Sequence, residues 1–230
     1  MVSETADAPF HVGLTPELVI DAAVALTSES HLMTWSLRDL AARLRVSPSV
    51  IYHHVGGKDM LCRRVVERVL EQIEAPPAGL EWQDWFRSLL YALGPLFAGY
   101  PGAAKWMLMH GPTTPAVLPI LEAGMAGLRA AGFGDRTASA YAVLLNNAML
   151  TISMSDDRLQ HEDDGPRDHA AMMDDLRRMH TASEELHRIG EDFLRPFAEG
   201  GERAERLRVD YYRFVIDTTI AGLAAMLDAP

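Results

Sequence analysis

The sequence predicts an all-α protein in which a small helical N-terminal domain precedes a larger helical C-terminal domain. Apolar residues recur at the three- and four-residue spacing of a helix along most of the chain, and no segment alternates apolar and polar residues over the length of a strand. Proline and glycine divide the chain into segments of helical length. This division is clearest at residues 75–79, where we place the domain boundary.

Composition restricts the class of protein. The 230 residues are 48% hydrophobic, which is ample material for a buried core. The single cysteine, Cys62, cannot form an internal disulfide, and residues 1–7 lack the basic and apolar run of a secretory signal. No stretch reaches the ~18 apolar residues of a membrane span. We therefore expect a cytoplasmic protein that does not cross a membrane.

Basic charge is concentrated in one stretch of this acidic chain. The net charge is −11, but residues 34–68 contain seven basic and three acidic side chains, which leaves this stretch at +4 and the remainder at −15. Clustered Lys and Arg bind phosphates, so the stretch permits binding to nucleic acid. A solvated helical surface explains the same pattern.

Helices are expected in the N-terminal domain over about residues 15–30, 36–44, 47–56 and 58–74. Thr15 followed by Pro16 is typical of a helix start. Ser36 with Asp39 three residues later predicts a capping box. Residues 1–13 lack periodicity, so we expect a disordered tail there and place the N-terminal domain at residues 14–74.

The second and third expected helices have the spacing of a helix-turn-helix, which places its second helix in the DNA major groove. Apolar residues would form the inner faces: Leu37, Leu40, Ala41, Leu44, Val46, Val50 and Ile51. Another group would face outward: Pro48, Ser49, Tyr52, His53 and His54. Packing does not explain exposed aromatic and imidazole rings on so short a helix, whereas contacts with base edges and phosphates do.

The stretch from Leu37 to Leu61 resembles the second to fourth helices of the TetR (tetracycline repressor) family of bacterial regulators. Tyr52, His54 and Lys58 match the best-known positions of that family. The resemblance implies a three-helix helix-turn-helix DNA-binding domain, followed by a larger helical domain for ligand binding and dimerisation. An ordinary three-helix packing unit is the alternative.

The resemblance also implies which residues contact double-stranded operator DNA. Arg38 would reach a base or a phosphate, Tyr52 and His54 would bind the backbone, and Lys58 would hold a phosphate beside a helix N-terminus. Sequence preference would come from Pro48, Ser49 and His53. The complete candidate set is Ser36, Arg38, Ser47, Pro48, Ser49, Tyr52, His53, His54 and Lys58.

Arg45 departs from the family pattern, which usually has glycine in the turn between the two helices. Either the turn holds an arginine in the left-handed conformation, at a cost of ~1 kcal/mol, or the turn has a different shape.

The second domain, residues 80–230, is expected to contain helices over about 82–99, 103–110, 114–131, 136–159, 170–195 and 202–228. The resemblance extends to it in patches and implies that residues 136–159 and 202–228 form a four-helix bundle in a homodimer. Candidate ridges are Ala140, Leu144, Ala148, Thr151 and Ser155 on one helix, and Leu207, Tyr211, Phe214, Val215, Thr218 and Leu223 on the other. The dimer would present two reading helices to a palindromic operator. An intramolecular core explains the same apolar residues.

An effector cavity is a further implication of the resemblance. The candidate lining residues are Trp85, Leu89, Trp106, Met107, Met109, His110, Asn147 and Met149. Family members that bind magnesium–tetracycline have a metal-binding histidine and several hydrogen-bonding side chains. At the corresponding positions this sequence has Met107, Leu89, Glu74 and Ala123. We therefore expect a small, largely apolar or aromatic effector that releases the protein from DNA.

Enzyme chemistry has little support in the sequence. Only Glu184 with His187 has the spacing of a di-iron ligand pair, and one copy is a chance-level match. The segment 160–169 is read as a solvated acidic loop, although its carboxylates and histidines could bind an adventitious cation. No phosphate-binding glycine loop or nucleophile elbow occurs. We expect no catalytic residue, metal or cofactor; a helical binding protein or enzyme that does not use its N-terminal unit on DNA is the alternative function.

Overall fold

The structure is a computed structural model that describes residues 13–111, 114–160, 174–175, 178, 183–196 and 201–228. All the regular elements within these ranges are helical, which confirms the predicted fold class. Contacts divide the chain into two units, residues 1–72 and 73–230, so the division falls between Gln72 and Ile73. The expected tail lies outside the described residues except for Gly13, and so does the expected acidic loop except for Gln160.

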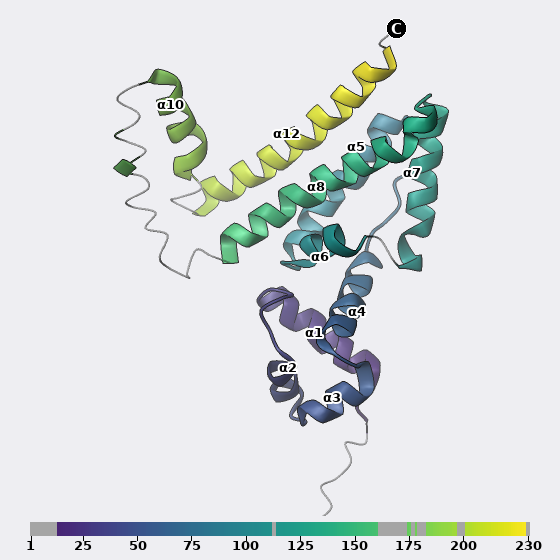
Figure 1. The fold of residues 1–230 in the computed structure, drawn as a ribbon, viewed down its shortest axis with the longest axis vertical. Coiled ribbons are helices and arrows are strands. Elements are labelled where there is room, and N and C mark those ends of the chain that lie inside the picture. The colour runs from purple at the N-terminus through teal and green to yellow at the C-terminus, as the bar shows by residue number, and fades with distance from the viewer. Residues whose placement is uncertain are drawn as a thin grey trace, which may run out of the picture. The chain divides into compact units, whose positions relative to one another are not determined.

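The smaller unit consists of four helices, α1 (Pro16–Glu29), α2 (Leu37–Leu44), α3 (Pro48–Val55) and α4 (Lys58–Leu70) (Figure 1). Two of the predicted caps are present. The Thr15 hydroxyl accepts from the Leu18 N–H at 3.3 Å, and the Ser36–Asp39 capping box opens α2. α4 ends at Leu70, four residues before the predicted end, because the exposed Glu71 and Gln72 no longer bury a face.

The four helices enclose one core. Its fully buried side chains include Val19, Ala23, Leu40, Ile51, Leu61, Val65, Val66 and Val69. Ala41 is also buried, as the sequence predicts for an inner position of α2. The core therefore fixes the four helices relative to one another within this unit.

The turn between α2 and α3 has the left-handed conformation at Arg45, with φ 56° and ψ 40°. Arg45 is the only non-glycine residue with positive φ among the residues described. Its N–H still donates to carbonyls of the last turn of α2. The first of the two expected shapes is thus the one present, and arginine takes the place for which glycine is better suited.

We expect Arg45→Gly to raise the free energy of unfolding of the smaller unit by up to ~1 kcal/mol, because it removes the Cβ that opposes the left-handed conformation. The greater freedom of glycine in the unfolded chain offsets part of this gain. Urea unfolding monitored by circular dichroism measures the change. Ala42→Gly, at an exposed right-handed position in α2, is the control and should lower stability by ~1 kcal/mol. A loss of stability in both variants would contradict the strain at Arg45.

The larger unit contains α5 (Trp82–Ala98), α6 (Ala103–His110), α7 (Leu118–Ala130), α8 (Thr137–Gln160), α10 (Glu184–Ile189) and α12 (Gly201–Asp228). Shorter turns η1 (Pro115–Val117), η2 (Gly134–Arg136) and η3 (Gly190–Leu194) join or extend them. The long helices α8 and α12 run side by side, and α5 packs against both (Figure 1). The helix expected over 170–195 is described only in part, chiefly as α10 and η3.

Polar contacts fix α5 against α12. The Tyr212 hydroxyl donates to the Leu90 carbonyl at 2.6 Å, and a side chain at Gly94 would overlap the Tyr212 ring. Asp217 accepts from Tyr91 at 2.7 Å and from Arg87 at 3.0 Å. Burial alone would raise the pKa of Asp217, but these hydrogen bonds lower it. Along the ranges that the structure describes, no helix is both long and apolar enough to cross a membrane.

Candidate nucleic-acid interface and effector site

Helix α3 buries one face and exposes the other. Ile51 and Val55 lie in the core. Tyr52 is 64% exposed although it is a large aromatic residue. The remaining outward positions behave as the sequence predicts, since Pro48, Ser49 and His53 are exposed and His54 is half-buried. α3 therefore presents a row of aromatic, imidazole and hydroxyl groups to solvent.

The exposed groups of α3 are capable of hydrogen bonding in both directions. The hydroxyls of Ser47 and Ser49 lie 2.8 Å apart, and the rings of His53 and His54 meet edge to face at 5.9 Å. Hydroxyls and neutral imidazoles both donate and accept hydrogen bonds, so they suit phosphate oxygens and base edges. Pro48 occupies the first turn, where its missing N–H leaves no helical hydrogen bond unmade.

At the start of α2, Ser36 is hydrogen-bonded within the helix cap, whereas Arg38 is exposed. The Ser36 hydroxyl donates to Asp39 Oδ2 at 2.7 Å and accepts from the Asp39 N–H at 3.3 Å, so it serves the capping box. Hydrogen bonds from Ser36 lower the pKa of Asp39. Arg38 is exposed and forms no ion pair with any residue that the structure describes. Its guanidinium is available to a phosphate or a base.

The basic stretch divides into ion-paired and available cations. Four arginines bind carboxylates of the same unit: Arg43 to Glu29, Arg63 and Arg64 to Glu67, and Arg68 to Asp21 and Glu71. Arg45 is exposed and, like Arg38, has no ion pair within the described ranges. Sequence reasoning treated Arg45 only as an exception to a turn pattern. Its position beside α3 adds it to the candidate DNA contacts.

Lys58 makes contacts within the smaller unit that the sequence did not predict. Its Nζ donates to the backbone carbonyls of Leu32 at 2.9 Å and Trp35 at 2.7 Å. The side chain is half-buried, and burial lowers the pKa of Lys58 to about 8. In this structure the ammonium is directed into the smaller unit.

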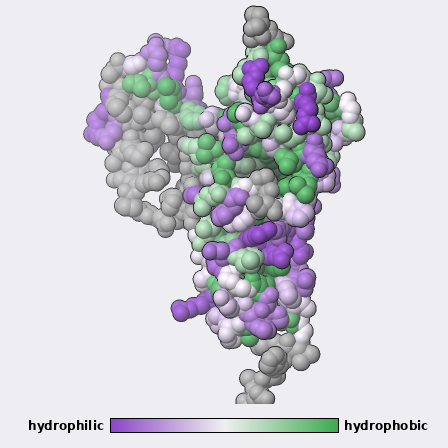
Figure 2. Space-filling view, turned by 45° about the vertical axis from the view of Figure 1, so that its right-hand side comes forward, coloured by the Kyte–Doolittle hydropathy of each residue, from purple (hydrophilic) through white to green (hydrophobic). Residues whose placement is uncertain are grey.

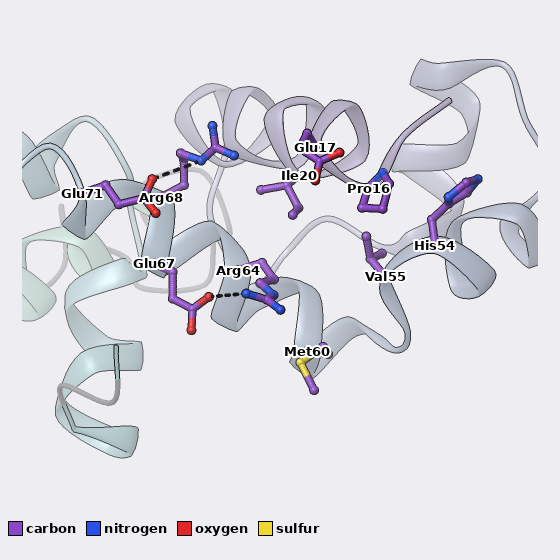
Figure 3. Close-up of a pocket in the computed structure, with 10 residues that line it drawn as sticks. All are labelled: Pro16, Glu17, Ile20, His54, Val55, Met60, Arg64, Glu67, Arg68 and Glu71. Carbon is purple, nitrogen blue, oxygen red and sulfur yellow. Dashed lines mark hydrogen bonds and ion pairs between the residues drawn. The ribbon is translucent and has the colours of Figure 1, made fainter. Parts of the chain in front are cut away.

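A groove of about 570 Å³ lies beside His54, between α1 and α4 (Figure 3). Figure 3 shows Arg64 paired with Glu67 and Arg68 paired with Glu71 along α4. With Glu17 on α1, the lining contains three carboxylates and two guanidiniums, and both guanidiniums are ion-paired. Because carboxylates repel phosphate, this groove is a poor site for DNA.

The eight expected effector-site residues occupy several environments in the larger unit. Trp85, Leu89, Trp106 and Met149 are buried, Met107 and Asn147 are half-buried, and Met109 and His110 are exposed. The rings of Trp106 and His110 stack on α6 with centroids 4.3 Å apart. Asn147 on α8 donates to the Thr219 hydroxyl on α12 at 3.0 Å.

Two hollows of the larger unit each include one of these eight residues. The first, of about 180 Å³ between α5 and α7, is lined by Trp82, Trp85, Phe86, Gly124 and Gly127, among others. The second, of about 390 Å³ between α8 and α12, includes Asn147, Thr151, Tyr211 and Thr218. The hollow between α5 and α7 is the more aromatic. Of its lining residues only Trp85 was a sequence-based candidate, and Ala123 was named only as a departure from tetracycline-binding members. The others were missed because no motif marks them: Ala78, Gly79, Leu80, Trp82, Phe86, Gly124 and Gly127.

An apolar stripe follows the exposed faces of α8 and α12. On α8 it consists of Val143, Leu150 and Met154, and on α12 of Tyr211 and Phe214, which is 64% exposed. Figure 2 shows that hydrophobic residues form part of the surface on the face in view. The expected small-residue ridge on α8 is placed differently. Ala140, Leu144 and Ala148 are buried within the chain, and only Thr151 and Ser155 line the hollow beside α12.

No protein-family model matches the chain. A curated relative from Saccharopolyspora erythraea, described as an HTH-type transcriptional regulator, is 27% identical over 152 residues, which are 66% of this chain and 64% of the relative. The match therefore spans less than two thirds of the length of that regulator.

Similar solved structures cover nearly all of the chain. ActR from Streptomyces coelicolor without ligand has a TM-score of 0.69 at 22% identity and covers 96% of this chain and 100% of its own. ActR in complex with actinorhodin has a TM-score of 0.65 at 20% identity, over 92% of this chain and 97% of its own. A TetR variant from Acinetobacter baumannii in complex with minocycline has a TM-score of 0.67 at 20% identity, over 94% of this chain and 96% of its own.

These likenesses show the fold of the chain. The chain has the all-α fold of the TetR-family regulators, with an N-terminal helix-turn-helix and a larger helical unit. The resemblance predicted from residues 37–61 is thus confirmed at the level of the fold. The helix-turn-helix in the description of the curated relative agrees with this fold.

Proposed function

We propose that this protein is a DNA-binding transcriptional regulator that reads the major groove with α3. The observation that carries the proposal is the 64% exposure of Tyr52 beside exposed Ser49 and His53, on a helix whose opposite face is buried. Arg38 and Arg45 supply exposed cations near the two ends of α2. Phosphate contacts from these groups would orient the helix, and Pro48, Ser49 and His53 would contact base edges.

The second element of the proposal is a homodimer that binds a palindromic operator. The apolar stripe of α8 and α12 supports it, because large exposed apolar side chains that gather on one face are typical of a protein interface. Two copies packed through these helices form a four-helix bundle. Half-sites about 34–36 Å apart, one turn of DNA, then follow from the two-fold symmetry.

The third element is a small, largely apolar or aromatic effector that binds the larger unit and releases the protein from DNA. The protein would thus act as a repressor in the absence of the effector, and it would do so in the cytoplasm. The hollow lined by Trp82, Trp85 and Phe86 supports this chemistry, because aromatic walls and glycines suit a planar apolar molecule. Its volume of about 180 Å³ fits only a small molecule, since ligand pockets are typically about 300–1,000 Å³. The two ligands found in related structures, actinorhodin and minocycline, are bound to those proteins. A thermal-shift screen of aromatic metabolites tests the effector class, since a ligand of the folded state raises the melting temperature.

Binding to DNA is tested by selection from a random duplex library together with gel shifts on the DNA that flanks its own gene. We expect a salt-sensitive complex with a palindromic sequence, since neutralised phosphates release counterions. Tyr52→Ala with His54→Ala should abolish the specific complex. Leu18→Ala, which removes an exposed apolar side chain from α1 of the same unit, is the control and should bind as the wild type does. Failure of the wild type on both DNA sources would overturn the proposal.

A further inference from the structure

The stretch of chain that joins α4 to α5 lines the hollow between α5 and α7. This connector consists of residues 71–81, between Leu70 and Trp82. The lining of the hollow includes a turn of the connector and the aromatic residues at the start of α5: Ala78, Gly79, Leu80, Trp82, Trp85 and Phe86. A molecule bound in the hollow would therefore contact the chain segment that continues into the helix-turn-helix unit.

The turn at Ala78–Leu80 is weakly held. Within the described ranges, no hydrogen bond involves residues 73–80. The side chains of Ala78 and Leu80 are exposed. Exposed backbone without hydrogen bonds opens locally at little cost in free energy. A ligand that contacts the turn can therefore change its conformation.

Two prolines stiffen the connector between this turn and α4. Pro76 and Pro77 have fixed φ angles, and each restricts the residue before it to extended conformations. Gly79 follows with φ 85°, a conformation that glycine adopts readily and other residues rarely do. Because a proline segment is a semi-rigid spacer, a displacement of the turn is passed on toward α4.

The hollow offers an apolar ligand a contact with the connector. Leu80 lines it and is 42% exposed, although it is a large apolar side chain. The hollow measures about 180 Å³, and an apolar protein cavity of about 150 Å³ is large enough to hold benzene. A ligand of one or two aromatic rings therefore fits. It would cover Leu80, because removing both apolar surfaces from water is favourable.

We propose that the turn Ala78–Leu80 is part of the effector site, and that an aromatic ligand in the hollow releases operator DNA by fixing this turn of the connector. The inference rests on the proposed function and adds the route of its regulation. Contacts between the ligand and Leu80 favour one conformation of the turn, so binding shifts the population toward it. By linkage, operator DNA lowers the affinity for the ligand by the same factor.

The first test uses indole as the probe and needs no DNA. In a nuclear magnetic resonance titration of the full chain, indole should shift the backbone amides of Gly79 and Leu80 together with the side-chain N–H of Trp85. Leu80→Ala should weaken indole binding about three- to tenfold, because part of the apolar contact is lost.

Leu118→Ala is the matched control for this test. Leu118 is 49% exposed in the same unit and lies outside the lining of the hollow, so this variant should bind indole as the wild type does. Three results would each overturn the inference: no binding of indole, shifts at Trp85 without shifts at the turn, or equal affinities of Leu80→Ala and the wild type.

The second test measures operator affinity with and without saturating indole. Indole should lower the affinity of the wild type at least about fivefold. Pro76→Gly combined with Pro77→Gly should bind indole normally, because neither proline lines the hollow, but the ratio of the two operator affinities should fall close to one. Pro115→Gly, at an exposed proline of the larger unit outside the hollow, should keep the wild-type ratio.

The outcomes separate this inference from the function on which it rests. If the wild type binds no operator, the proposed function fails and the regulatory role fails with it, whatever indole does at the turn. If the wild type binds operator and indole together without loss of affinity, only the regulatory role is overturned. A wild-type ratio in the double glycine variant would likewise show that the connector is not the route.

Discussion

Phe214→Glu is expected to convert the protein to a monomer in solution and to weaken binding to a palindromic operator by two orders of magnitude or more. Phe214 is 64% exposed and is the more exposed of the two stripe residues on α12. Burial of each Phe in a dimer would contribute ~1.5–3 kcal/mol, whereas a buried carboxylate without a partner is unfavourable. A monomer would bind one half-site and lose the ~10²–10⁴-fold gain of bivalent binding.

Analytical ultracentrifugation and operator titration measure the two effects. Val209→Glu is the control, since Val209 is also an exposed apolar residue of α12 but lies about 140° around the helix from Phe214. It should leave the dimer intact. Because Phe214 is exposed within one chain, circular dichroism should show a folded Phe214→Glu monomer. If this variant remained dimeric with full affinity, the apolar stripe would not be the dimer interface.

The smaller unit could be predicted closely from the sequence because local chemistry sets its boundaries. Thr15, Ser36 and the Gly56–Gly57 pair act on residues within one helical turn, so their effect is visible in a short window of sequence. The outward positions of α3 follow from the same local pattern, since Ile51 and Val55 fix which face is buried. A short window of sequence does not contain the hydrogen-bond partner of Lys58, because Leu32 lies 26 residues away.

The larger unit was less predictable because its long helices are apolar on more than one side. α8 buries Ala140, Leu144 and Ala148 against its own chain and exposes Val143, Leu150 and Met154. Both sets have helical spacing, so periodicity alone could not decide which one faces a partner. For the same reason the eight effector-site candidates do not line one cavity in the structure, since Trp and Met at helical spacing are usually core residues.

A second large effect is expected at Gly124 in α7, where three aromatic rings leave no room for a side chain. A Cβ there would lie 2.9 Å from the Tyr141 ring and 3.0 Å from the rings of Phe86 and Trp85. Burial raises the pKa of Tyr141 to about 12, and its ring meets Phe86 edge to face, so these rings are already packed. Gly124→Ala should therefore cost ~1–3 kcal/mol by overpacking, although alanine itself favours the helix.

Gly127, one turn further along α7, provides the matched control. A Cβ there would meet only the Trp82 Cβ, at an ordinary 3.8 Å. Gly127→Ala should thus gain up to ~1 kcal/mol of helix propensity, and the two alanine variants should melt on opposite sides of the wild type by ~2–4 °C per kcal/mol. Calorimetry measures this difference. Stabilisation by Gly124→Ala would show that α5 and α7 can separate at no cost. The two walls of the hollow beside Trp85 would then have no fixed spacing, and the hollow would not be a preformed aromatic site.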